Sequence, residues 1–564
     1  MKKILTILLA LAMLASGVAT AEGASNEVDF AAWGVTLPIV DQGEKVTLRI
    51  AVPQSAENYD ADKVWFWKWA SGAMNISFDV EQIPSESVEQ RKNLMFASGD
   101  LPDIIYGMGF STADLVKYGQ YEKQLLPVNR YLNEEVMPHL TRWSSLTSFE
   151  LCVTPDGNQY VLPYIDRVAL NDGNGHPLYI NKELTAAVGK QMPTTVEELT
   201  ELLRAFKAAY PDMIPMGGSA LSVNYIMVHL MNAYGLGVSS DNPYGVSPAM
   251  RRSADIVVPC ATPEYKEYLT TMNTWFREGL ISQDFFTMDR ATDMAQAAEG
   301  KYAAWCYPYD QVTQDPEIVH RYQGVINLLS AANDVISVPA PVRTRPGNAV
   351  IAANTEHPET CAKFLDFFYS PVGMVYGWYG PMAGSKDTLG MVEGWYVDPE
   401  TMVVNYKDVE NGAFTSSYTY AIGVIAPCSG ARLNNCGDYN LDLSKYGSHA
   451  AIQLPMAGYD PVPLAKNPDL LSDYPLWTIY STTEFRYAEK SFYASYTYMD
   501  EETSIAVSDL KTVIQNYVET ETARFVTGAR SLDEFDSYLA ELEKMNVDEY
   551  LGYYTALAEK QAAQ

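Results

Sequence analysis

The first part of the chain alternates short apolar runs with segments of helical spacing. Three apolar runs have the length of buried strands: 46–52, 76–80 and the end of 100–106. Between them, 58–73 and the segment from Ser87 to Ser98 carry apolar residues at helical intervals. Ser87 with Gln90 forms a capping-box pattern, and Gly99 supplies a stop. This order predicts a parallel sheet covered by helices.

A second region of the same kind follows residue 178. Thr195 with Glu198 caps one predicted helix, and Thr262 with Pro263 opens another that stops at Gly279. The remaining predicted elements are a helix over 291–300, a strand over 302–306, extended pieces at 335–340 and 348–354, a helix from Pro358 to before Pro371, and helices capped at Ser531 and Asn546. Residues 371–500 lack clear periodicity, so we expect loops, hairpins and short helices there.

The stretch 160–209 links the two regions. It reads as a strand (YVLPYI), a polar loop, a second strand and helix (PLYINKELTAAVG), and a capped helix. Hydrophobic cores stop growing at roughly 250–300 residues, so a chain of 564 residues needs at least two lobes. We interpret the stretch as a crossing between lobes, with a cleft at the crossing. The expected units are a signal peptide at 1–21, a flexible lead-in at 22–44, lobe 1 at 45–160 plus 335–372, and lobe 2 at 161–334 plus 373–564, with an aromatic, loop-rich insertion at about 373–500.

The first 21 residues have the pattern of a secretory signal. Lys2 and Lys3 precede an apolar run at 4–15 that is too short to span a bilayer. The tripeptide at 19–21 (ATA) matches a cleavage site, so we expect the mature chain to start at Glu22. The sequence therefore predicts an exported protein.

Composition narrows the function further. The net charge of −31 argues against binding to nucleic acid or to acidic lipid headgroups. The chain holds 39 Tyr and 10 Trp, and these side chains stack on sugar rings as well as filling cores. Its six cysteines form no zinc-like pattern. Export permits disulfides, with Cys428 and Cys436 as the most plausible pair and free thiols as the alternative.

Several segments together resemble one protein family. They are ASGDLPDII at 97–105, YVLPYI at 160–165, LYINKEL…MPTTVEEL at 178–199, EGKYAAWCYPY at 299–309, NTEHPETCAKFLDFFYSPVG at 354–373 and FVTGARSLDEFDSYLAELEKMNVDEYL at 525–551. In this order they are similar to the extracellular solute-binding proteins of ABC importers, carbohydrate-binding family 1, and more narrowly to the large lipoprotein type of Gram-positive and gut bacteria.

The resemblance implies a fold and a function. The fold would be α/β and two-lobed, of the periplasmic-binding-protein type II, with a mixed sheet flanked by helices in each lobe and a ligand cleft between the lobes. The function would be capture of a carbohydrate, most plausibly an oligosaccharide, by a monomer that delivers it to ABC transporter permease subunits without a cofactor or metal.

One feature departs from the family pattern. Gram-positive members usually carry a lipidated cysteine just after the signal, but here 14–17 reads LASG and no cysteine precedes Cys152. We therefore expect a free periplasmic or secreted protein rather than a lipid-anchored one.

Candidate ligand-binding residues are aromatic or planar polar side chains at strand ends and crossings. Aromatic faces cover the C–H side of a sugar ring, and planar polar groups pair with its hydroxyls. The candidates are Trp67, Trp69, Asp103, Tyr106, Tyr164, Asp166, Trp305, Tyr307, Tyr309, Trp378, Tyr379, Trp395 and Arg432. For each the alternative is a structural role: core packing for the aromatics, turn capping for Asp103 and a surface position for Arg432.

Catalysis finds little support in the sequence. The six histidines are scattered, and no nucleophile elbow, zinc-protease, Walker or dinucleotide motif stands in a fitting context. The loop at 172–175 (DGNG) hints at calcium but lacks the glutamate that an EF-hand needs. Two alternatives stay open: an exported glycoside hydrolase, which would need two carboxylates about 5–10 Å apart, and a receptor of the same fold for a peptide or another small solute.

Overall fold

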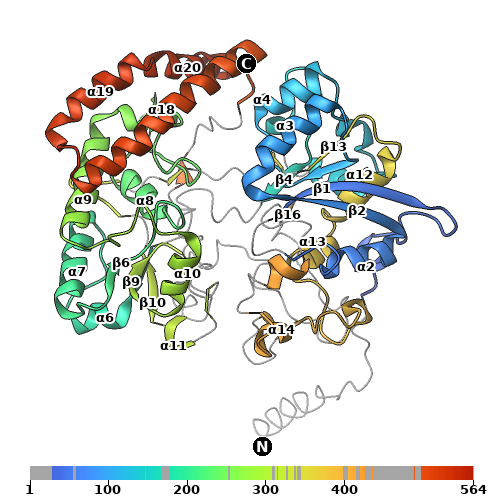
Figure 1. Cartoon of the computed structure of the whole chain (residues 1–564), viewed down its shortest axis with the longest axis horizontal. Coiled ribbons are helices and arrows are strands. Elements are labelled where there is room, and N and C mark those ends of the chain that lie inside the picture. The colour runs from blue at the N-terminus through green and yellow to red at the C-terminus, as the bar shows by residue number, and fades with distance from the viewer. Residues whose placement is uncertain are drawn as a thin grey trace, which may run out of the picture.

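The structure, a computed structural model, describes residues 28–54, 59–145, 148–166, 178–251, 255–307, 312–313, 316–319, 321–325, 328–335, 338–339, 344–347, 349–397, 404–414, 420–425, 434–435, 488–489 and 497–562. Two lobes lie side by side, one holding most of the N-terminal elements and the other the green and red elements of Figure 1. Each lobe contains a mixed sheet with helices packed on it, which confirms the predicted two-lobed α/β fold.

The first lobe is built on a sheet of order β13-β3-β1-β2. Its strands are β1 (Val46–Gln54), β2 (Ile76–Pro84), β3 (Ile104–Tyr106) and β13 (Ala349–Ile351). β1 pairs with β2 and β3 in parallel, whereas β13 runs antiparallel to β3. The helices of this lobe are α2 (Trp65–Met74), α3 (Val88–Ser98), α4 (Thr112–Asp114), the π-helix η3 (Leu115–Tyr121), α5 (Pro138–Ser144), α12 (Pro358–Phe367), α13 (Pro371–Trp378) and α14 (Lys407–Glu410).

The second lobe has a sheet of order β10-β5-β9-β6. Its strands are β5 (Leu178–Asn181), β6 (Ile214–Met216), β9 (Tyr302–Trp305) and β10 (Tyr322–Val325), with β6 and β9 parallel. Its helices are α6 (Lys182–Ala187), α7 (Val196–Ala209), α8 (Tyr225–Ala233), α9 (Pro263–Arg277), α10 (Arg290–Ala298), α11 (Pro316–Val319), α18 (Glu501–Thr527), α19 (Phe535–Lys544) and α20 (Val547–Ala562). The short strands β7 (Ala249–Met250) and β8 (Ile256–Val257) pair with each other.

Small sheets lie where the chain passes between the lobes. β4 (Pro163–Asp166) pairs antiparallel with β12 (Thr344–Pro346) and parallel with β16 (Asn434–Asn435). β11 (Val338–Pro339) pairs with β17 (Ala488–Glu489). The segment 497–500 is a further crossing, because Thr112 of the first lobe donates to the Thr497 carbonyl while Met499 belongs to the core of the second lobe.

Hydrophobic packing suggests a lobe division that differs from the expected one. Buried residues from 178 to 328 and from 499 to 554 form one cluster, whereas those from 35 to 165 and from 349 to 424 form two others around β1–β3. The described part of 373–425 therefore packs on the first lobe, not on the second lobe as expected. We propose the described residues of 28–166 and 344–425 as the first lobe and those of 178–335 and 497–562 as the second.

The local sequence patterns predicted most of the helices and strands, but three features of the helices differ from the prediction. α2 begins at Trp65, because a turn closed by Lys63 N–H donating to the Asp60 carbonyl comes first. Ser87 is the N-cap residue of α3 but makes no side-chain capping bond, so the predicted capping box is absent. The 27-residue α18 was not predicted. Within the described residues, no helix combines the length and the hydropathy that a membrane span needs.

Candidate functional site

In the second lobe, aromatic rings gather at the carboxyl end of β9. β9 reads YAAW, and all four of its residues are buried. Trp305 is 0% exposed and packs 5.8 Å from the Tyr302 ring and 5.4 Å from the Tyr307 ring. The Arg290 guanidinium, from the first residue of α10, lies 5.7 Å from the Tyr307 ring centre. Tyr307 is thus held between a buried indole and a cation.

Buried polar contacts fix this end of the sheet. The Tyr302 hydroxyl donates to the Asp293 carboxylate at 2.9 Å, and Asp293 is fully buried. Burial raises the pKa of Asp293 above its ordinary value. Asp289 caps α10 by accepting from the Thr292 N–H at 2.8 Å. These bonds hold α10, and therefore Arg290, against β9.

In the first lobe, a second aromatic group surrounds the β14–β15 hairpin. β14 (Trp395–Val397) pairs with β15 (Val404–Tyr406), which places Trp395 opposite Tyr406. Trp395 is buried, its indole N–H donates to the Gly380 carbonyl at 2.9 Å, and its ring lies 5.7 Å from that of Tyr379. Tyr379 and Tyr406 stack at 6.5 Å, and both are half-buried. This group therefore offers two partly exposed tyrosines supported by a buried tryptophan.

The turn before β14 explains how the hairpin is held. Gly394 has φ +82, and a Cβ there would lie 2.4 Å from the Pro381 carbonyl oxygen, so the close approach requires glycine. The Asp408 carboxylate accepts from the N–H groups of Glu393 and Gly394, which ties α14 to the same turn. In Figure 1, α13 and α14 lie on the side of the first lobe that faces the second.

The crossing sheet provides a third group. Tyr164 of β4 pairs with Arg345 of β12, and the guanidinium lies 4.6 Å from the centre of the tyrosine ring. Both residues are half-buried. Gly347 lets the two strands approach, since a Cβ there would lie 2.3 Å from the Leu162 carbonyl oxygen. The Tyr369 hydroxyl donates to the Pro163 carbonyl at 2.6 Å and fixes β4 to the first lobe.

Other predicted site residues lie within the first lobe's core. Trp67 packs on Phe78, Trp69 stacks on Trp65, and Tyr106 is 2% exposed. Their burial, like that of Trp305, Tyr307 and Trp395, leaves no ring face for a ligand in this structure, because each ring fills the core beside its own strand or helix.

Asp103 has a structural position. Its carboxylate accepts from the backbone N–H of Arg49 at 2.8 Å and from the Thr355 hydroxyl, and so joins β3 to β1 and to the segment after β13. Asp103 therefore bonds to the backbone of a neighbouring strand. The structural alternative was that it would cap the turn that follows it.

Four candidates cannot be placed. Tyr309 and Arg432 lie outside the described residues, as do the side chains of Asp166 and Trp378. Among the described contacts, the predicted residues meet in two pairs, Trp305 with Tyr307 and Tyr379 with Trp395.

Sequence reasoning missed three residues that complete these groups: Arg290, Arg345 and Tyr406. The predicted return crossing could have suggested Arg345, because two crossing segments of a hinge must run side by side. No comparable signal marks Arg290 or Tyr406.

In the described residues, metal-ligating side chains are not clustered and the free cysteines are buried. No three His, Cys, Asp or Glu side chains among them are grouped as a metal site would require. Cys152, Cys260, Cys306 and Cys361 are buried free thiols. Burial raises their pKa values, to about 12 for Cys260 and Cys361. The loop at 172–175 and the pair Cys428 and Cys436 lie outside the described residues.

Two known proteins are similar to this chain in sequence. The chain is 23% identical over 410 residues, 67% of its length and 71% of the relative's, to the "Fructooligosaccharide ABC transporter substrate-binding protein FusA" of Streptococcus pneumoniae. It is 25% identical over 285 residues to "Lipoprotein LipO" of Bacillus subtilis, covering 46% of this chain and 49% of LipO.

Solved structures agree over almost the whole chain. FusA in complex with kestose superposes with a TM-score of 0.66 at 20% identity, covering 92% of this chain and 100% of FusA. An HMO-binding solute-binding protein from Bifidobacterium longum infantis gives a TM-score of 0.67 at 17% identity, covering 91% and 98%. The family model described as "Bacterial extracellular solute-binding protein" matches residues 53–375, more than half of the sequence. The chain therefore belongs to the family of bacterial extracellular solute-binding proteins.

Proposed function

We propose that this protein captures an oligosaccharide between its two lobes and delivers it to the permease of an ABC transporter. The observation that carries the proposal is the repeated grouping of aromatic faces with polar side chains at β9, at the β14–β15 hairpin and at the β4–β12 crossing. Aromatic faces beside directional donors are what a sugar ring needs. FusA, whose name describes a fructooligosaccharide ABC transporter substrate-binding protein, supports the same ligand class.

The three groups would share the ligand. Arg290, which is half-buried, would bind it from the second lobe with its guanidinium held against the buried Tyr307 ring, and Tyr379 and Tyr406 would bind it from the first. Tyr164 and Arg345 lie where the chain passes between the lobes, so a sugar there would contact the crossing itself. A guanidinium has five N–H donors in a fixed plane and can pair with adjacent hydroxyls. Trp305 and Trp395 would act indirectly, by supporting Tyr307 and Tyr379.

Binding would act through a shift in population between open and closed forms. A ligand that touches both lobes has more contacts in the closed form than in the open one, and this difference in affinity drives closure. The proposed mechanism requires no covalent step. For delivery to a permease the protein must lie outside the cytoplasm, and the signal-like segment at 1–21, which lies outside the described residues, would direct the export.

Calorimetric titration against a panel of neutral oligosaccharides and short peptides, with chromatographic analysis of the products, tests the proposal. We expect saturable binding of at least one oligosaccharide and its recovery intact. Binding restricted to peptides would overturn the ligand class, and hydrolysis of a bound glycan would overturn the non-catalytic mechanism. Tyr379→Ala should lower the affinity for that oligosaccharide, whereas Leu94→Ala, at an exposed position on α3, should not.

A further inference from the structure

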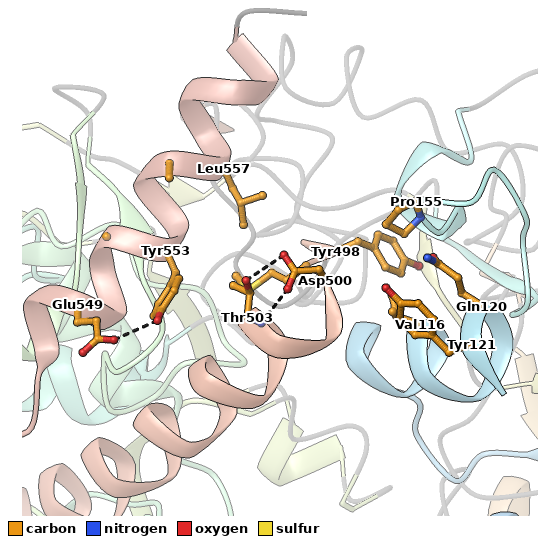
Figure 2. A pocket seen from close by; sticks show the side chains of 13 residues that line it. Val116, Gln120, Tyr121, Pro155, Tyr498, Asp500, Thr503, Glu549, Tyr553 and Leu557 are labelled. Carbon is orange, nitrogen blue, oxygen red and sulfur yellow. Dashed lines mark hydrogen bonds between the residues drawn. The ribbon is translucent and has the colours of Figure 1, made fainter.

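A cavity of about 710 Å³ lies between the lobes at a place that contains none of the proposed sugar-binding residues. One wall comes from η3 of the first lobe and includes Val116 and Gln120, and the opposite wall comes from α20 and includes Tyr553 and Leu557. Tyr498, from the crossing at 497–500, lies between these walls, as Figure 2 shows. A molecule in this cavity would contact both lobes and the segment that joins them.

Two of the residues that line the cavity each have a polar atom with unmet hydrogen-bonding capacity. Gln120 Oε1 and the Tyr498 hydroxyl are both buried and have no hydrogen-bond partner among the described residues. In Figure 2 the Tyr498 ring points toward Gln120 at the first-lobe end of the cavity. Burial raises the pKa of Tyr498, so its hydroxyl stays protonated and can donate. Buried polar groups usually have partners, so two such atoms beside one cavity indicate a missing one.

The lining defines the chemistry that fits. Val116, Tyr498 and Leu557 are among its apolar or aromatic members, which suit a ring. Asp500 and Glu549 are its charged residues, and among the described residues that line the cavity there is no Lys, Arg or His. The two carboxylates already accept bonds from Thr503 and Tyr553, so their charge is held at the rim. An anionic ligand would therefore be repelled, whereas a neutral or cationic one would be accepted.

We propose that this cavity is a second binding site, separate from the sugar site, for a small organic molecule that has an apolar ring, an O–H or N–H donor and no negative charge. Both atoms are covered in this structure, so the two side chains would turn toward the ligand, whose donor would bind Gln120 Oε1; where that group is a hydroxyl, its lone pair would accept a hydrogen bond from the Tyr498 hydroxyl. Because the ligand touches both lobes, its binding would also depend on how far the lobes are rotated apart.

Three probes of similar shape test whether the cavity excludes a negatively charged ligand: benzyl alcohol, benzylamine and benzoate. Binding to the full chain is followed by ligand-observed NMR titration. Ala556→Trp fills the cavity from an exposed position on α20, so the fold should tolerate it. Ala97→Trp is the matched control, since Ala97 is an exposed helical alanine outside the cavity. Gln120→Leu keeps a similar volume and removes the acceptor.

We expect benzyl alcohol and benzylamine each to bind Ala97→Trp with the same affinity as the parent protein. Benzoate should bind neither protein. Ala556→Trp should abolish binding, and Gln120→Leu should weaken it by about two- to tenfold, the range for one hydrogen bond. Circular dichroism and thermal unfolding establish that each variant is folded; should Ala556→Trp fail to fold, Gln120→Leu decides the question. No binding to the parent protein, equal binding of benzoate, or unchanged affinity in folded Ala556→Trp or Gln120→Leu would overturn the proposal.

Discussion

Replacing Trp305 separates a core role from a ligand-stacking role. The sequence favoured a ring that stacks on sugar, whereas the structure leaves Trp305 0% exposed between Tyr302 and Tyr307. A buried aromatic side chain removes about 150–250 Å² from water, which at about 25 cal/mol per Å² gives an upper bound of roughly 4–6 kcal/mol. Replacing a buried Trp with Ala typically costs about 3–5 kcal/mol.

Trp305→Ala should therefore lower the unfolding free energy of the second lobe by about 3–5 kcal/mol. For a unit of about 150–250 residues, each kcal/mol shifts the melting temperature by roughly 2–4 °C, which gives a decrease of about 6–20 °C. Trp305→Phe keeps a ring in the same space and should cost less. Urea unfolding followed by circular dichroism measures the stability, and calorimetry measures the affinity for the oligosaccharide.

The two interpretations predict different results for Trp305→Phe. If the indole only supports Tyr307, sugar affinity should stay within about threefold of the parent value, because less than one hydrogen bond's worth of free energy is lost. A tenfold or larger loss of affinity with unchanged stability would show that the indole meets the sugar, and our assignment of Trp305 to the core would be wrong.

Three further predictions concern the first lobe and the C-terminal helices. Arg530→Met should lower the unfolding free energy by about 1.5–3 kcal/mol in urea titrations, the range for one hydrogen bond to a charged group, because the buried Glu521 carboxylate loses its 2.6 Å partner and keeps only Arg524 at 2.7 Å; adding Glu521→Leu should restore most of it, and no restoration would contradict the pairing. Burial raises the pKa of Asp366 to about 7, so its folded form keeps a proton that the unfolded chain releases, and its contribution to stability should fall as pH rises from about 4 through 7. Asp366→Asn should therefore gain stability relative to the parent over that window, and a pH-independent difference would refute this. Tyr379→Ala should weaken oligosaccharide binding by about 1–3 kcal/mol, the range for stacking one half-buried aromatic face, and unchanged calorimetric affinity would remove Tyr379 from the site.

Local signals predicted elements whose partners are close in the chain. The apolar run of β1 forms a strand buried in one core with Trp65 of the following helix α2, whereas β2 buries only Ile76 and Ile83. α18 was missed although its pattern was visible: Val507, Ile514 and Val518 recur at helical spacing and are all buried. The helix was not predicted because its N-cap, Asp500, comes directly after a long stretch without clear periodicity.

The site was harder to predict, because it depends on pairing between distant segments. A tryptophan at a strand end can face the core or the ligand, and the sequence around Trp305 does not distinguish the two. The contact between Tyr164 and Arg345 requires the antiparallel register of β4 and β12, which lie far apart in the chain. Charge and aromatic content could therefore indicate the ligand class but not the side chains that meet it.

Small-angle X-ray scattering with and without the bound oligosaccharide tests most directly whether the sugar is captured between the lobes. We predict that a saturating oligosaccharide lowers the radius of gyration, because contacts from both lobes favour the closed form. A control titration with a non-binding sugar should leave the scattering unchanged. A bound oligosaccharide that leaves the radius of gyration as it is in the free protein would place the sugar on one lobe alone and contradict the account.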